Sequence, residues 1–272
     1  MPQLLDDLRP FQTIRERRRT LAWLLGASAL PLVGCGGGDG DSSAFDTSSG
    51  TTSGSCAVIP SETEGPYPAD GTNTASGSVV NALGLSGIVR SDITTSLPSS
   101  LGSATGMPLT ITLQLVNTNA SCASLAGHAV YIWHCDAYGR YSMYSSGITA
   151  QNYLRGVQVS DANGQVTFTT IFPGCYAGRW PHVHFEVFAS PAQATRGTND
   201  IKTSQLALPE DICRLVYATS PYTAGSSLAN LNGITLASDN VFGNDGAALQ
   251  LAAVTGSVAT GFAATLEVGI AA

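Results

Sequence analysis

Two histidines separated by a single residue are the first feature of the sequence that could do chemistry. His182-Val183-His184 lies in a strand-like run. Because a strand sends alternate side chains to opposite faces, His182, His184 and Glu186 share one face. Two imidazoles placed in this way can clamp a metal ion. The chain has only four histidines, so the pair favours a metal site over the alternative, a chance pair in a core strand.

Two tyrosines close to turns add oxygen donors. Tyr176 follows the turn Pro173-Gly174-Cys175, and Tyr141 follows a turn over residues 136–140. The chain has no Cys-x-x-Cys pair, so a cysteine-based metal site is not expected. Two phenolates with two imidazoles form a hard, doubly anionic set, which suits ferric iron better than zinc or cuprous copper. Taken singly, either tyrosine could instead be a half-buried strand aromatic.

Alternation of apolar and polar residues predicts the strands that must hold these side chains. Residues 109–115 and 166–169 alternate cleanly, and residues 262–270 alternate less cleanly. Turn sequences such as residues 161–164 separate the runs, and one short helix is expected near residues 209–216. Many short strands with glycine-rich turns predict an all-β fold, either a sandwich or a barrel.

Composition and charge exclude several classes of protein. The chain has 272 residues, a net charge of −7 and only 11% charged residues, and Lys202 is its single lysine. Such an acidic chain lacks the basic surface that nucleic acid requires. Gly, Ser, Thr and Ala are abundant, whereas coiled coils and helical bundles need far more Glu, Lys and Leu.

The N-terminus reads as an export signal. A basic start precedes an apolar run over residues 20–33, which is shorter than the roughly 20 residues that span a bilayer. Gly34 and Cys35 follow the run, as in bacterial lipoprotein signals, and Arg18-Arg19 resembles a twin-arginine export signal. We therefore expect residues 1–35 to be a signal peptide that leaves a lipid on Cys35. The alternative is a buried helix.

Residues 36–55 predict a linker, because fifteen of these twenty residues are Gly, Ser or Thr. It would tether a lipid to a folded domain, or be a disordered end with no role. The domain is expected over residues 56–272. Five cysteines remain there, so at least one thiol stays free, and Cys122–Cys213 is the expected disulfide.

Two segments of the domain resemble a known family. Residues 133–142 (WHCDAYGRYS) and 161–185 (DANGQVTFTTIFPGCYAGRWPHVHF) are similar to the intradiol ring-cleavage dioxygenases, which include the protocatechuate, catechol and hydroxyquinol enzymes. The resemblance begins at Ser61-Glu62-Thr63-Glu64-Gly65-Pro66-Tyr67 and continues to about Ala218. It implies an antiparallel β-sandwich with long loops that holds a non-haem ferric ion, Fe(3+).

The resemblance also implies roles for particular residues. Tyr176 and His182 resemble the axial ligands, and Tyr176 would be the ligand that the substrate displaces. Arg179 matches the arginine that stabilises negative charge on the substrate ring, and Gln205 resembles a glutamine just outside the metal ligands. Gly65-Pro66-Tyr67 is expected on the substrate side. The implied metal ligands are Tyr141, Tyr176, His182 and His184.

The implied function is that of an enzyme of aromatic compound catabolism. A catechol-type substrate and O2 would react so that the ring opens between its two hydroxylated carbons, giving a muconate-type diacid. The alternative is a catalytically inactive or carbohydrate-binding β-sandwich lipoprotein on the cell surface. Export would place the domain in the periplasm or on the surface, attached to membrane only through Cys35. The oligomeric state is left open, with a homodimer as one option.

Two cysteines depart from the family pattern. Cys175 directly precedes Tyr176, where bulkier residues or proline are common, and Cys135 follows Trp133-His134. The two thiols could pair with each other, or one could contact the substrate. His128 and His134 match no ligand position and are expected to be ordinary strand or turn residues.

Overall fold

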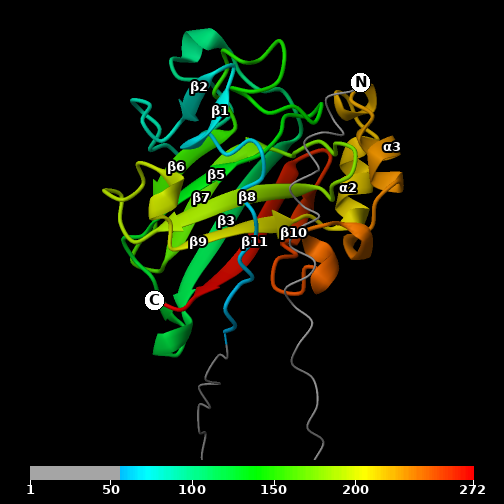
Figure 1. The fold of residues 1–272 in the computed structure, drawn as a ribbon. Coiled ribbons are helices and arrows are strands. Elements are labelled where there is room, and N and C mark those ends of the chain that lie inside the picture. Colours follow the sequence, from blue (N-terminus) through cyan, green and yellow to red (C-terminus); the bar gives the residue numbers. More distant parts are fainter. Residues whose placement is uncertain (1–55) are drawn as a thin grey trace, which may run out of the picture. The chain divides into compact units, whose positions relative to one another are not determined.

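Two β-sheets packed face to face form the frame of the fold in this computed structural model, which describes residues 56–272 (Figure 1). The predicted export signal, Cys35 and the predicted linker over residues 36–55 lie outside the described residues. Within residues 56–272, no helix has the length and apolar character needed to cross a membrane.

The first sheet has four strands, and every neighbouring pair in it is antiparallel. In spatial order the strands are β6 (Arg155–Val159), β5 (Ala129–Trp133), β8 (His182–Phe188) and β9 (Lys202–Ala207). The run that contains both histidines is therefore a central strand, as the period-two pattern predicts.

The second sheet has five strands. Its members are β10 (Ala253–Ser257), β11 (Gly261–Ile270), β3 (Pro108–Asn117), the short β4 (Ala123–Ser124), and β7 (Gln165–Ile171), which pairs with β3. These include all three runs predicted to be strands. The all-β sandwich is thus confirmed, with one difference: β3 and β11 pair in parallel. Alternation specifies a strand and its faces, but not the direction of its neighbour.

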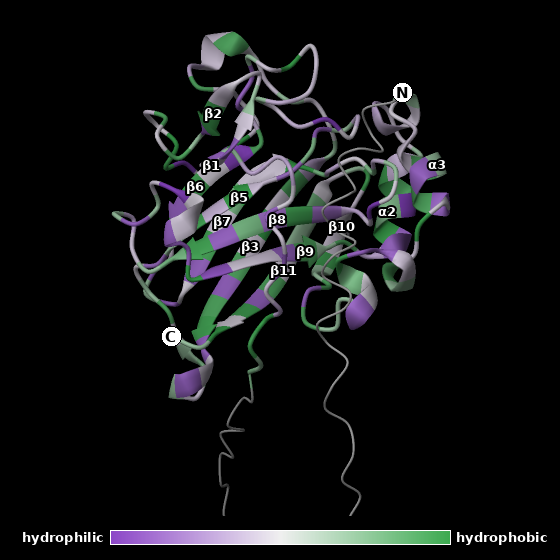
Figure 2. Ribbon diagram, in the orientation of Figure 1, coloured by the Kyte–Doolittle hydropathy of each residue, from purple (hydrophilic) through white to green (hydrophobic). Residues whose placement is uncertain are grey.

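Apolar side chains from the facing sides of both sheets make the main core. Val183 and Phe185 point into it from β8, and Leu113 and Phe168 point into it from the second sheet. Figure 2 shows hydrophobic and hydrophilic bands alternating along strands such as β3. A second cluster, which includes Tyr131 and Trp133, covers the opposite face of the four-stranded sheet. Burial on both faces explains why all seven residues of β8 are buried.

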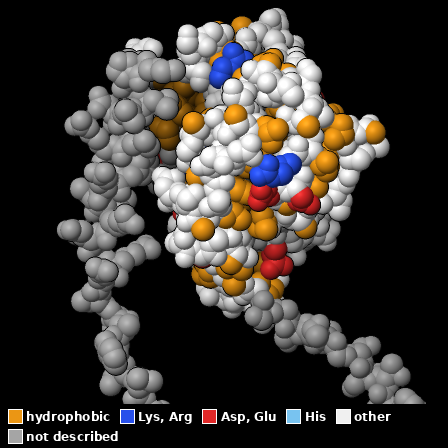
Figure 3. Space-filling view, turned by 90° about the vertical axis from the view of Figure 1, so that its right-hand side faces the viewer, with side chains coloured by type: hydrophobic (Ala, Val, Ile, Leu, Met, Phe, Trp, Pro, Cys, Tyr) orange, Lys and Arg blue, Asp and Glu red, His pale blue; other side chains and the backbone are white. Residues whose placement is uncertain are grey.

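The second cluster packs under a hairpin of β1 (Asp70–Ala75) and β2 (Ser78–Asn81). Helices α2 (Glu210–Tyr217) and α3 (Ser227–Asn232) lie at one end of the sheets (Figure 1), and α2 confirms the short predicted helix. Charged side chains are sparse on that side of the molecule (Figure 3). Short 3-10 turns are η2 (Ser99–Leu101), η3 (Thr118–Ala120), η4 (Gly197–Asn199), η5 (Tyr222–Ala224), η6 (Leu236–Ser238) and η7 (Phe242–Asn244).

The predicted disulfide is wrong in one partner. Cys122 pairs with Cys56, whereas Cys213 is a free, fully buried thiol on the core side of α2. Cys135 and Cys175 are also free and buried, so they do not pair with each other. Connectivity depends on which chain segments meet in space, and cysteine spacing does not encode that.

The Cys56–Cys122 disulfide closes a loop across 66 positions of sequence. Replacing both cysteines with serine should lower the free energy of unfolding by about 3 kcal/mol, because the unfolded chain gains freedom. Urea unfolding with and without a reductant measures the effect. The double variant should no longer respond to the reductant. An oxidised wild type as unstable as the variant would contradict the prediction.

Candidate metal centre

The four predicted metal ligands come from three elements that meet on the outer face of the four-stranded sheet. His182 and His184 lie on β8, with the intervening Val183 held in the main core. Tyr141 follows the turn after β5, where the carboxylate of Asp136 accepts hydrogen bonds from the backbone and side chain of Arg140. Tyr176 lies in the loop between β7 and β8.

Short distances link the polar atoms of these four side chains, each to the next. Tyr141 Oη lies 3.5 Å from Tyr176 Oη, and Tyr176 Oη lies 3.1 Å from His182 Nε2. His182 Nε2 is in turn 3.1 Å from His184 Nε2. Ligands that share a metal ion have such separations, because each lies roughly 2 Å from the ion. The structure therefore brings all four residues together.

Burial keeps both imidazoles neutral. It lowers the pKa of His182 to about 3 and lowers the pKa of His184 well below its usual value. Nδ1 of His182 faces the carbonyl oxygen of Trp180, so Nδ1 carries the proton and Nε2 presents its lone pair. Nδ1 of His184 is buried without a hydrogen-bond partner. Both rings thus direct Nε2 into the same small space.

Burial also raises the pKa of both phenols. The pKa of Tyr176 rises to about 12, and that of Tyr141 rises well above its usual value. A bound trivalent cation would reverse this effect and favour the phenolates. Among residues 56–272, no group of three or more His, Cys, Asp or Glu is placed to hold a metal. Two hard oxygens and two neutral nitrogens fit a non-haem ferric ion.

Aromatic packing holds the rings in place. Trp133 stacks on His184 with 4.9 Å between ring centroids and 6° between planes. Tyr67 lies against Tyr141 at 4.9 Å. Gly65 passes so close to His184 that a Cβ there would lie 3.3 Å from the imidazole, and its φ is +73°. Residues 65–67 therefore lie over the candidate ligands, as expected for the substrate side.

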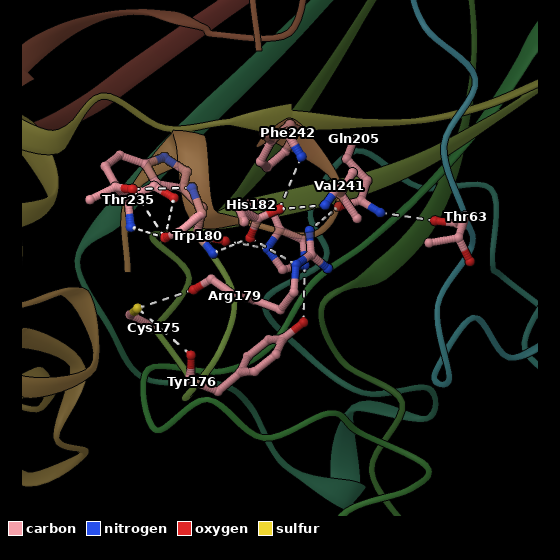
Figure 4. A network of polar contacts seen from close by, with 12 residues as sticks. Thr63, Cys175, Tyr176, Arg179, Trp180, His182, Gln205, Thr235, Val241 and Phe242 are labelled. Carbon is pink, nitrogen blue, oxygen red and sulfur yellow. Dashed lines mark hydrogen bonds and ion pairs between the residues drawn. The ribbon is translucent and has the colours of Figure 1, made fainter. Parts of the chain in front are cut away.

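Arg179 lies beside Tyr176 and His182 (Figure 4), and two neighbours hold its guanidinium. Its Nε donates to Asp239 Oδ2 at 3.0 Å, and Nη2 donates to Gln205 Oε1 at 2.7 Å. Gln205 pairs with His184 across β8 and β9, and its amide donates to the carbonyl of Thr63 at 2.9 Å. All six predicted site residues thus lie in one region.

Comparison with known proteins agrees with this arrangement. A family model described as "Dioxygenase" matches residues 90–214, which contain all six predicted site residues. An intradiol ring-cleavage dioxygenase from Tetranychus urticae shares the fold, with a TM-score of 0.61 and 26% identity over 79% of this chain and 95% of its own. Over these residues the chain is similar to the intradiol ring-cleavage dioxygenases. The dioxygenase Tetur07g02040 is similar too, with a TM-score of 0.59 and 26% identity over 79% and 94% of the two chains. No curated protein matches the sequence.

Asp239 is the residue of the candidate site that sequence reasoning missed. It lies 60 positions after Arg179 and outside residues 90–214. Its carboxylate also accepts hydrogen bonds from the backbone N–H groups of Trp180, Val241 and Phe242. An acidic residue in a loop gives no periodic or motif signal, so only the folded chain reveals this contact.

The two remaining histidines are not ligands. His128 is partly exposed, and its Nδ1 faces the carbonyl of Ala126. His134 is buried between the carbonyl of Cys135 and the hydroxyl of Thr170. Glu186 shares a face with the ligand histidines, but burial, followed by the nearby Asp70, raises its pKa to about 10. Its carboxyl group is therefore protonated at neutral pH.

Glu62 gives a prediction about pH and stability. Burial, followed by repulsion from Asp245, raises the pKa of this half-buried carboxyl to about 7. A folded pKa above the unfolded value means that its contribution to stability is present at low pH and is lost as pH rises through 7. Between pH 5 and pH 8, the free energy of unfolding should therefore fall by about 1 kcal/mol less in Glu62→Gln than in the wild type. This value allows for the partial exposure of the side chain.

Urea unfolding at both pH values measures this difference. The neighbouring exposed Glu64→Gln is the matched control and should behave as the wild type does. A Glu62→Gln protein with the wild-type pH dependence would rule out the assignment.

Proposed function

We propose that the protein is a non-haem ferric dioxygenase. It would cleave a catechol-type ring between its two hydroxylated carbons, with both atoms of O2 entering a muconate-type diacid. Similarity to the intradiol ring-cleavage dioxygenases supports ring cleavage of catechols in general. The observation that carries the proposal for this chain is the convergence of two phenol oxygens and two imidazole nitrogens at separations of 3.1 to 3.5 Å.

The chain's own residues have distinct parts in this chemistry. A bound ferric ion would supply Lewis acidity and a template that makes the catechol reactive toward O2. Tyr176 is the more exposed of the two phenols, so of the two tyrosines that would hold the ion it is the better placed to take a substrate proton on its oxygen. Arg179 would offset negative charge that develops on the substrate.

The surrounding residues would orient the substrate and exclude water. Tyr67 covers Tyr141, and Phe242 lies beside His182 with 6.4 Å between ring centroids. Both residues belong to segments that lie against the ligand set from outside the sheet. An enclosed, dry site strengthens every electrostatic interaction within it.

The test is iron loading followed by oxygen uptake. The iron-loaded protein should show a visible tyrosinate-to-iron band that shifts when a catechol is added without oxygen, and it should consume one O2 per diol in a panel of diols. Tyr176→Phe should alter the band, whereas Tyr138→Phe, an exposed tyrosine, should not. An iron-loaded protein whose band ignores every diol would favour the rival binding-module function.

We also propose that the enzyme is exported and attached to a membrane by lipid on Cys35. The basic start, the short apolar run and the residues before Cys35 support this. Labelled fatty acid should be incorporated by the wild type and not by Cys35→Ala. Equal labelling of both would refute the anchor.

A further inference from the structure

Both carboxylate oxygens of Asp239 are engaged near the candidate centre. Its side chain has no exposed surface. Oδ2 accepts from Arg179 Nε at 3.0 Å and from the backbone N–H of Trp180 at 2.7 Å. Oδ1 accepts from the backbone N–H groups of Val241 and Phe242 at 2.9 and 3.0 Å. Attraction to Arg179 and these hydrogen bonds outweigh burial and lower its pKa, so it is ionised.

Asp239 and Gln205 together fix the plane of the Arg179 guanidinium. They engage Nε and Nη2 from two different segments of the chain. A planar guanidinium held at two of its nitrogens cannot rotate freely. Among the described residues, the hydrogen bonds of the Arg179 guanidinium use Nε and Nη2, so the Nη1 donors stay available to a ligand.

The same contact cancels the charge of Arg179. The other buried cation nearby, Arg155, offers no donor to a substrate, because Nε, Nη1 and Nη2 all bind carbonyl or hydroxyl oxygens. Arg140 is paired with Asp136. The region therefore presents a directed hydrogen-bond donor in Arg179 but no uncompensated cation free to pair with a carboxylate.

We propose that Asp239 is a positioning residue that orients Arg179 and, by cancelling its charge, makes the site select catechols with an uncharged ring over carboxylated ones. This inference rests on the proposed function and narrows its substrate class. A carboxylate on the substrate ring would enter a site where the Asp239 carboxylate is already paired with Arg179. The substrate carboxylate could then form no ion pair with Arg179 to offset the cost of its desolvation.

The decisive variant is Asp239→Asn, which keeps the shape and the Oδ1 acceptor but removes the charge. We expect kcat/KM for catechol to fall by about 30-fold as Arg179 loses its fixed orientation. The ratio of kcat/KM for protocatechuate to that for catechol should rise by about tenfold, because the cation is uncovered. Glu210→Gln breaks an exposed ion pair with Arg214 on α2 and is the matched control, with both values unchanged.

A second variant, and a measurement that does not depend on activity, distinguish the orienting role of Asp239 from the effect of its charge. Asp239→Glu retains the charge, so it should lower kcat/KM without raising the ratio. The exchange rate of the Arg179 Nε proton, followed by NMR in metal-free protein, should increase about tenfold or more in Asp239→Asn as the charge-assisted hydrogen bond is lost.

An unchanged substrate ratio in Asp239→Asn, in a wild type that cleaves catechol, would overturn the inference and leave the proposed function standing. A loaded wild type that cleaves no diol would overturn the proposed function and the selectivity with it. The Arg179 exchange rate would then still decide whether Asp239 holds the guanidinium, and an unchanged rate would refute that part.

Discussion

Replacing His184 with alanine should leave the purified protein without stoichiometric iron and without ring cleavage. His184 Nε2 is 3.1 Å from His182 Nε2, so the substitution deletes one of four converging donors and leaves a gap beneath Trp133. We expect iron content to fall at least about tenfold and kcat/KM to fall by about a thousandfold or more, because the lost ligand supplies both affinity and geometry. Elemental analysis and oxygen uptake measure the two effects.

His128→Ala is the matched control, since it removes a partly exposed imidazole that lies outside the ligand set. It should retain the iron content and activity of the wild type. Thermal unfolding of both variants separates loss of metal from loss of fold. A folded His184→Ala protein with the wild-type iron content would contradict the assignment of His184 as a ligand.

Replacing Arg179 with glutamine should separate catalysis from metal binding. The guanidinium lies outside the four donors and is held by Asp239 and Gln205. The variant should keep its iron and its visible band, while kcat falls by about 100-fold to 1,000-fold, as when an oriented charge is removed from a buried site. Steady-state oxygen uptake, set against iron content, measures this.

Arg214→Gln is the control for the loss of an arginine, because Arg214 forms an exposed ion pair on α2. It should change neither rate nor iron content. Arg179→Gln also leaves the buried carboxylate of Asp239 without its charged partner, so its stability must be measured alongside. A folded variant that retains the wild-type kcat would exclude Arg179 from the reaction.

The strands and the faces of the candidate site were predictable from local pattern. Period-two alternation placed His182 and His184 on one face of a strand, and β8 has that geometry with Val183 and Phe185 in the core. The turns that precede Tyr141 and Tyr176 suggested oxygen donors, and motif resemblance added Arg179 and Gln205. Each of these inferences depends on residues close together in sequence, where backbone geometry alone sets which side chains point the same way.

Features that depend on distant segments were not predictable. The parallel pairing of β3 with β11 joins strands far apart in the chain. The Cys56–Cys122 disulfide and the contact between Asp239 and Arg179 likewise depend on how long loops return to the sheet. A single sequence does not show which distant segments come into contact. The expected partner of Cys122 was therefore wrong, and Asp239 was overlooked.

The most direct measurement is a crystal structure of the iron-loaded protein with data collected on both sides of the iron absorption edge. The anomalous difference map should contain one strong peak within bonding distance of four atoms, Oη of Tyr141 and Tyr176 and Nε2 of His182 and His184. A peak elsewhere, or none in a crystal whose protein carries stoichiometric iron in solution, would contradict the account.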